Sequence, residues 1–159
     1  MTQPDPTALP GITASLESLE LAVREGRAAS DPQRLLDLVP YARFLGLRCA
    51  RAAERLIVTM RFAPSLIGDA SIQALHGGTL AGLLESTAAF HALFVTEVTG
   101  MPKTISLTID YLRSARAVDT SCEAVVIRQG RRFVVLQVTA YQDQRDAPVA
   151  MAVVKLKVG

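Results

Sequence analysis

The sequence predicts an α+β fold in which one long apolar helix lies against a curved antiparallel sheet. The stretch from Thr79 to Val98 is apolar on nearly every face, which indicates a helix that must be covered almost all round. Apolar and polar residues alternate along several later segments, most regularly from Thr104 to Tyr111, which indicates half-buried strands. Short turns between these segments indicate antiparallel neighbours in a meander.

The composition suits one compact globular protein. Of 159 residues, 50% are hydrophobic and 20% are charged, and a net charge of +2 is too small to indicate nucleic-acid binding. The N-terminus lacks the basic and apolar regions of a signal peptide. Glu85, His91 and Glu97 interrupt the apolar stretch, which favours a buried helix over a membrane span. Cys49 and Cys122 match no metal-ligand spacing, so we expect reduced thiols, no metal site and a cytoplasmic location.

Helical signals precede the sheet. Apolar residues recur at helical spacing from Ile12 to Val23, Asp31-Pro32 resembles an N-cap followed by a first-turn proline, and Pro40 to Gly46 marks one further turn. No linker sets these segments apart. We therefore expect residues 1–45 to form a tail and a helical extension that pack on a core domain of residues 46–159.

From Leu47 onward the period of the apolar residues changes to two. An early strand is predicted around Leu56 to Met60, and a loop through Asp69 leads to the long helix, which Gly100 and Pro102 are expected to close. Later strands are predicted over residues 104–111, 122–128, 132–141 and 149–158. The sheet covers one side of the helix, and a second copy of the chain is the simplest cover for the rest.

Glu85 is the first candidate functional residue, because it is the only charged side chain between Gly77 and Phe90. Burying an ionised carboxylate without a partner is energetically costly. A core ion pair or a solvent-facing position is one explanation, and a catalytic acid, base or nucleophile is the other. The residue pattern alone leaves both open.

The triplet His76-Gly77-Gly78 stands where the long helix begins. The first amide groups of a helix have no acceptor inside it and favour negative charge, and glycines let a substrate approach the backbone closely. The triplet therefore predicts an oxyanion site for a carbonyl group that becomes tetrahedral. An ordinary capping histidine before a tight turn is the alternative.

The run His76-Gly77-Gly78-Thr79-Leu80-Ala81-Gly82-Leu83-Leu84-Glu85 resembles the signature of the hotdog-fold thioesterases related to the phenylacetate-pathway enzyme. The loop before it and the later strands resemble the same family, so that the resemblance covers residues 40 to 158. It implies a hotdog fold, in which a curved antiparallel sheet wraps a long central helix. It also implies hydrolysis of acyl-CoA, with coenzyme A as part of the substrate and no other cofactor. The implied assembly is a homodimer with shared active sites, or a dimer of dimers that forms a homotetramer.

The resemblance also implies roles for particular residues. Glu85 is expected to attack the thioester carbonyl or to activate a water molecule that does so. The amide of Gly77 is expected to polarise the carbonyl oxygen, while His76 orients the thioester. Gly78 and Thr104 are expected to contact the substrate, the latter through a hydroxyl group at the start of a strand.

Other candidates lie outside the helix. Asp69 stands near the place where relatives carry Asn or Gln, and a carboxylate there would repel Glu85. Arg128, Arg131 and Arg132 cluster at one predicted turn. In this fold coenzyme A lies along the sheet surface, and guanidinium groups suit its phosphate oxygens, although a solvated turn is the ordinary explanation. Arg113 is a further candidate for substrate binding.

Hydrolysis of an acyl-CoA thioester is the leading hypothesis. A hydratase or dehydratase of the same fold also uses a histidine and an acidic residue, but the spacing from His76 to Glu85 favours hydrolysis. A non-catalytic acyl-CoA-binding module is the third possibility. Release of free CoA thiol separates hydrolysis from the other two.

Overall fold

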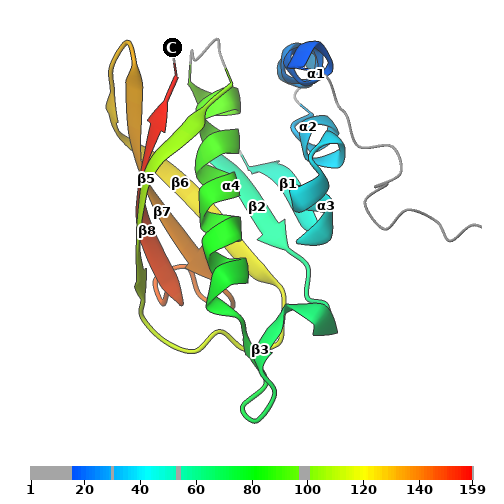
Figure 1. Ribbon diagram of the computed structural model, residues 1–159, viewed down its shortest axis with the longest axis vertical. Helices are drawn as coiled ribbons and strands as arrows, with labels where there is room; N and C mark the ends of the chain where they lie inside the picture. Colours follow the sequence, from blue (N-terminus) through cyan, green and yellow to red (C-terminus); the bar gives the residue numbers. More distant parts are fainter. Residues whose placement is uncertain (1–15, 30, 53–54, 97–100, 159) are drawn as a thin grey trace, which may run out of the picture.

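The computed structural model describes residues 16–29, 31–52, 55–96 and 101–158 (Figure 1). One long helix, α4 (Gly77–Val95), lies across a six-stranded antiparallel sheet whose strand order is β1-β2-β6-β7-β8-β5. Three shorter helices lie beyond the β1 side of the sheet (Figure 1). This arrangement confirms the predicted α+β class with a long central helix and N-terminal helices.

Five strands match the predicted segments to within two residues at each end: β2 (Arg55–Met60), β5 (Lys103–Tyr111), β6 (Thr120–Gln129), β7 (Phe133–Tyr141) and β8 (Ala150–Lys157). The structure adds β1 (Leu47–Ala52), which begins where the period of the apolar residues changes and for which no bounds were predicted. The predicted meander is only partly correct, because β6, β7 and β8 are sequential neighbours whereas β5 pairs with β8. The chain reaches β6 from β5 through residues 112–119, which pass close to the start of α4, since the amide of Leu75 donates to the carbonyl of Ala115 at 2.9 Å.

The N-terminal helices are α1 (Leu16–Ala29), α2 (Gln33–Leu38) and α3 (Pro40–Phe44). The predicted N-cap of α2 is one residue too early, because Pro32 occupies the cap position and Asp31 Oδ1 instead accepts a hydrogen bond from the amide of Gln33 at 3.1 Å. Gly46 ends the α3 turn with a φ of 62°, a value that glycine adopts without steric cost. Ile12 lies outside the described residues.

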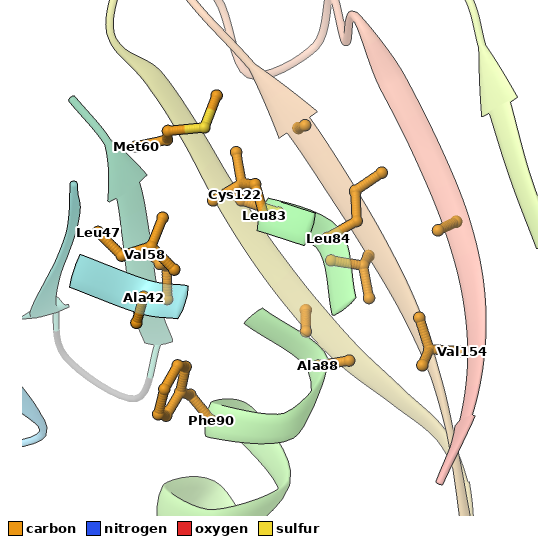
Figure 2. Packing of buried hydrophobic residues seen from close by; sticks show 14 of the residues in the cluster. Ala42, Leu47, Val58, Met60, Leu83, Leu84, Ala88, Phe90, Cys122 and Val154 are labelled. Carbon is orange, nitrogen blue, oxygen red and sulfur yellow. The ribbon is translucent and has the colours of Figure 1, made fainter. Parts of the chain in front are cut away.

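The core lies between α4 and the sheet. Leu83, Leu84 and Ala88 of α4 are fully buried against strand residues such as Val58 and Val154 (Figure 2). By length and composition α4 is apolar enough to cross a membrane, yet 56% of its apolar 18-residue stretch is buried inside the protein, as expected for a core helix. The helix ends at Val95 rather than Val98, and the predicted closing residue Gly100 lies outside the described residues.

The two cysteines are free thiols, as predicted. Burial raises the pKa of both Cys49 and Cys122 to about 12, so both remain protonated at neutral pH. In the segment predicted as a loop, the structure adds a 3-10 turn (Pro64–Leu66) and a small hairpin of β3 (Ile67–Asp69) and β4 (Ala74–Leu75). This hairpin leads directly into α4 and positions its first residue.

Candidate active site

His76 is the N-cap residue of α4. Its backbone is extended, with φ −68° and ψ 132°, and its Nδ1 accepts a hydrogen bond from the amide of Gly78 at 2.9 Å. Because Nδ1 is an acceptor, a neutral imidazole must carry its hydrogen on Nε2. The side chain is exposed, so this second nitrogen supplies a donor to a ligand at the helix entrance. Capping and ligand binding are therefore compatible roles for His76.

The approach hairpin holds His76 in place. The amide of His76 donates to the carbonyl of Leu66 at 2.9 Å. A Cβ atom at Gly68 would lie only 2.6 to 2.9 Å from Cα, Cβ and Cδ2 of His76. Glycine at this position therefore lets the hairpin backbone pack directly on the histidine.

The amide of Gly77 opens α4 and has no acceptor within the helix. The carbonyl of the same peptide unit, on His76, accepts three hydrogen bonds: from the Thr79 amide at 2.9 Å, the Thr79 hydroxyl at 2.7 Å and the Leu80 amide at 3.4 Å. Hydrogen bonds to a carbonyl polarise its peptide and strengthen the attached N–H donor. The Gly77 amide is thus arranged to bind a negatively charged oxygen.

Tyr111 is a residue of this site that the sequence analysis treated only as part of a strand. Its hydroxyl donates to the carbonyl of Gly77 at 2.9 Å. Its ring packs on Gly77, where a Cβ atom would lie 3.3 to 3.4 Å from ring and hydroxyl atoms. The contact joins residues 34 positions apart, which local periodicity does not detect. The available signal was the alternation along β5, which places Tyr111 on the same face as Leu107 and Ile109.

Glu85 is half-buried on α4, as are Ser86 and Ala89, whereas Leu83, Leu84 and Ala88 are fully buried. It follows Gly77 by eight residues, which corresponds to ~12 Å along the helix at ~1.5 Å per residue. One chain therefore does not bring the Glu85 carboxylate to the Gly77 amide. A thioester carbonyl therefore cannot contact both groups within one subunit.

Asp69 is the last residue of β3, beside the β3–β4 turn, and is exposed. Its Oδ1 accepts hydrogen bonds from the hydroxyl of Ser71 at 2.6 Å and from the amide of Ser71 at 2.9 Å. The Ser71 hydroxyl bond, followed by the backbone bond, lowers the pKa of Asp69. The lowered pKa favours an ionised Asp69 whose side chain stabilises the start of the turn, five residues before β4.

Arg128, Arg131 and Arg132 surround a cavity of about 340 Å³ at the β6–β7 turn. Lys155, which the sequence analysis missed, lines the same cavity and lies 4.9 Å above the ring of Phe133. The sequence does not indicate this neighbour, because Lys155 lies on β8 and comes near the β6–β7 turn by pairing with Val135 of β7. The cluster is therefore more basic than the turn alone suggested.

This basic cavity and Thr104 lie at the far end of the sheet from Gly77 within one chain. Tyr111, which contacts Gly77, ends β5, whereas Lys103 begins β5 and pairs with Lys157 beside the β6–β7 turn. The eight steps from Lys103 to Tyr111 span ~26 Å at ~3.3 Å per residue. A β-bulge between Thr104 and Ser106 pairs Thr104 with buried Leu156, so Thr104 faces the helix side of the sheet.

Arg113 has hydrogen bonds that account for it structurally, whereas the buried Nδ1 of His91 has no hydrogen-bond partner among the described residues. The Arg113 guanidinium donates to the carbonyls of Pro148, at 3.2 Å, and Ala147, which ties the β5–β6 connection to the β7–β8 turn. His91 is buried in α4, and desolvation lowers its pKa, which keeps the imidazole neutral. In the parts of the chain that the structure describes, no three His, Cys, Asp or Glu side chains group as a metal site would require.

The fold is shared with solved hotdog structures of the thioesterase superfamily. A protein from Chromobacterium violaceum is 27% identical, with a TM-score of 0.72 over 86% of this chain and 96% of that chain. A protein from Shewanella oneidensis related to the thioesterase superfamily is 26% identical, with a TM-score of 0.69 over 82% and 97% of the two chains. A phenylacetic acid degradation-related protein from Ralstonia eutropha, described as a proposed thioesterase, shows likeness of fold alone at 22% identity, with a TM-score of 0.68 over 80% and 98%.

These likenesses and the helix entrance define a hotdog-fold protein of the thioesterase superfamily. The family model of the acyl-CoA thioesterase N-terminal domain matches residues 66–156, which is more than half of the chain. The chain therefore belongs to this acyl-CoA thioesterase family. No curated protein sequence matches it.

Proposed function

We propose that the protein hydrolyses an acyl-CoA thioester to the free acid and coenzyme A in the cytoplasm. The observation that carries the proposal is the pairing, on one helix, of an N-terminal amide prepared for a negatively charged oxygen with the half-buried carboxylate of Glu85. Water supplies the oxygen of the new acid, and the sulfur of coenzyme A leaves with a proton as the free thiol. Coenzyme A arrives with the substrate, and no other cofactor takes part.

In the proposed mechanism Glu85 either attacks the carbonyl carbon or removes a proton from the attacking water. In the first case the C–S bond breaks to release the CoA thiolate, and water then hydrolyses the resulting anhydride to the acid and free Glu85. The carbonyl oxygen gains negative charge as the centre becomes tetrahedral, and the Gly77 amide stabilises that charge. The Nε2 hydrogen of His76 orients the thioester beside this amide. The Glu85 carboxylate thus provides or activates the nucleophile. The positive end of the α4 dipole favours the negative charge that develops on the carbonyl oxygen.

A homodimer supplies the geometry that a single chain lacks. If two α4 helices pack antiparallel across a two-fold axis, the Glu85 of one subunit meets the Gly77 of the other. Two features support this assembly: Glu85, Ser86 and Ala89 of α4 are part-exposed, and β5 is the last strand of the sheet with no further strand beside it among the described residues. A dimer of dimers would keep the same two-subunit sites.

The proposed dimer would also bring the basic cavity of one subunit toward the site of the other. An antiparallel pair of β5 strands brings the Lys103 end of one subunit beside the Tyr111 end of the other. The cavity lined by Arg128, Arg131 and Arg132 then approaches the Gly77 amide of the other subunit. We propose that these arginines bind the phosphates of coenzyme A, and that Thr104 contacts water or substrate in the shared site.

The arginine proposal predicts a substrate-selective defect. Replacing Arg128, Arg131 and Arg132 together by alanine should raise KM for CoA esters roughly tenfold, since charge-assisted hydrogen bonds to phosphate are lost. KM for the N-acetylcysteamine thioester of the same acid, which lacks the nucleotide, should hardly change. Arg34→Ala, an exposed arginine of α2 paired with Glu25, serves as the control. Equal effects of the triple substitution on both substrates would assign the cluster a structural role.

Tyr111→Phe keeps the ring on Gly77 and removes the hydroxyl bond to its carbonyl. We expect kcat to fall about three- to tenfold with little change in KM, because a hydrogen bond of this kind contributes about 1 kcal/mol and here holds the first turn of α4. Tyr141→Phe is the matched control, since its hydroxyl donates to Glu123 rather than to α4. It should affect the melting temperature and leave kcat unchanged. A wild-type kcat in Tyr111→Phe would show that the Tyr111 hydroxyl does not contribute to catalysis.

A thiol-release screen tests the proposed function itself. The purified protein is incubated with short, long, aromatic and hydroxylated acyl-CoAs, and free thiol and free acid are both measured. Hydrolysis predicts equal amounts of the two products. Loss of the substrate double bond without thiol release would instead identify a hydratase, and tight binding without turnover would identify an acyl-CoA-binding module.

A further inference from the structure

Helix α3 of the N-terminal extension presents two aromatic rings beside α4. Tyr41 and Phe44 stack with their ring centroids 6.0 Å apart and an interplanar angle of 18°. They are 49% and 62% exposed, although Ala42 and Leu45 between and after them are buried in the core. The buried pair anchors α3 firmly, while the aromatic pair forms an apolar surface that the described chain leaves open.

Tyr41 packs directly on the backbone of α4 at Gly82. A Cβ atom at Gly82 would lie 2.6 Å from the Tyr41 hydroxyl oxygen, 2.9 Å from its Cε1 and 3.0 Å from Cδ1 of Leu45. Glycine weakens the interior of a helix relative to alanine, so its presence in the middle of α4 calls for an explanation. The close approach of the Tyr41 ring provides one, because any larger residue would push the ring away.

Gly82 lies on the same face of α4 as the groups of the proposed site. Gly78, Gly82 and Glu85 are spaced by four and three residues, which aligns them along one side of the helix. Gly82 precedes Glu85 by ~4.5 Å along the axis at ~1.5 Å per residue. The Tyr41 ring therefore stands between the helix entrance and the carboxylate, on the face where the substrate is proposed to bind.

We infer that Tyr41, stacked on Phe44, forms a rigid wall of the acyl pocket and limits the size of the acyl group. The inference rests on the proposed thioesterase function, because that function places the thioester carbonyl next to Glu85. The first acyl carbons beyond that carbonyl then lie within reach of a ring one helical turn away. A wall held by Gly82 and Leu45 cannot easily move, and a rigid apolar pocket discriminates between acyl groups that differ by a few methylenes.

The test compares acyl selectivity in position-41 variants. We measure kcat/KM for straight-chain acyl-CoAs of increasing length and for phenylacetyl-CoA, together with Kd values for the corresponding non-hydrolysable alkyl-CoA thioethers. Tyr41→Ala should raise the ratio of kcat/KM for large acyl groups to kcat/KM for small ones at least about tenfold. The Kd values of the thioethers should shift in favour of the large groups by a similar factor. Tyr41→Phe keeps the wall and should retain wild-type selectivity. Tyr41→Leu is a second variant that keeps apolar contact with Leu45 but lacks the ring.

Leu21→Ala, which removes an exposed apolar side chain from α1, is the matched control and should leave selectivity unchanged. Equal changes for every acyl length in Tyr41→Ala and Tyr41→Leu would overturn the inference. So would a fall in molecular mass to that of a monomer, which would assign the ring to a subunit interface. Failure of the proposed hydrolysis would be seen differently, as no thiol release from the wild type with any ester, and the thioether Kd ratios would then still decide the role of Tyr41.

Discussion

Glu85→Gln is expected to lower kcat for acyl-CoA hydrolysis by about a hundredfold or more while the protein keeps its fold. Glutamine has nearly the same size and shape as glutamate, so packing around α4 should be preserved. The amide group neither attacks a thioester nor accepts a proton from water, so either proposed role of Glu85 is lost. The reaction would then depend on the Gly77 amide and on substrate positioning alone.

The measurement is steady-state kcat by thiol release, with the melting temperature as evidence of folding. Glu25→Gln is the control, because it makes the same chemical change at an exposed side chain of α1 that pairs with Arg34. An exposed pair of this kind contributes little to stability, so both kcat and the melting temperature should stay close to wild type. Normal turnover in folded Glu85→Gln would refute the proposed mechanism.

Two inactive variants are expected to restore activity to each other. Glu85→Ala removes the carboxylate, and Gly77→Pro removes the amide hydrogen at the first position of α4, where proline is tolerated. The preceding residue, His76, already has the extended backbone that a following proline requires. Each variant alone should be inactive, because each homodimer has two sites that lack the same group.

Unfolding, mixing in equal amounts and refolding should recover about a quarter of wild-type activity. Half of the dimers would be heterodimers, and each would contain one intact site and one site that lacks both groups. Gly77→Ala is the control for crowding against Tyr111, because it adds a Cβ atom 3.3 to 3.4 Å from Tyr111 ring and hydroxyl atoms but keeps the amide hydrogen. No recovery in verified heterodimers would show that each site lies within one chain.

The sequence predicted the helix and the strands because their signals are local. Alternation identified β5, and the His76-Gly77-Gly78 triplet marked the entrance of α4, which begins at Gly77, two residues before the predicted apolar stretch. Neighbour relations were predicted less well, since periodicity does not say which strand lies beside which, and β5 pairs with β8 rather than β6. Local signals therefore fixed the elements but not their full arrangement.

The same limit applies to the site. Glu85 was detected because it is a charge in an apolar helix, which is a local anomaly. Tyr111 and Tyr41 were missed because their contacts with Gly77 and Gly82 join segments that are distant in the sequence. Both contacts involve glycines of α4. Glycines within a helix indicate that another segment packs closely there, but they do not identify which residue it is.

The bulge in β5 also determines where charge lies on the sheet. With strict alternation from Leu107 and Tyr111, Lys103 would share the helix-facing side with these residues and bring an ammonium group toward the core. The extra residue reverses the order, so Lys103 pairs with Lys157 on the outer face while Thr104 turns inward. One inserted residue thus puts the Lys103 ammonium group and the Thr104 hydroxyl group on opposite faces of the sheet. Lys103 joins Lys155 and Lys157 on the outer face.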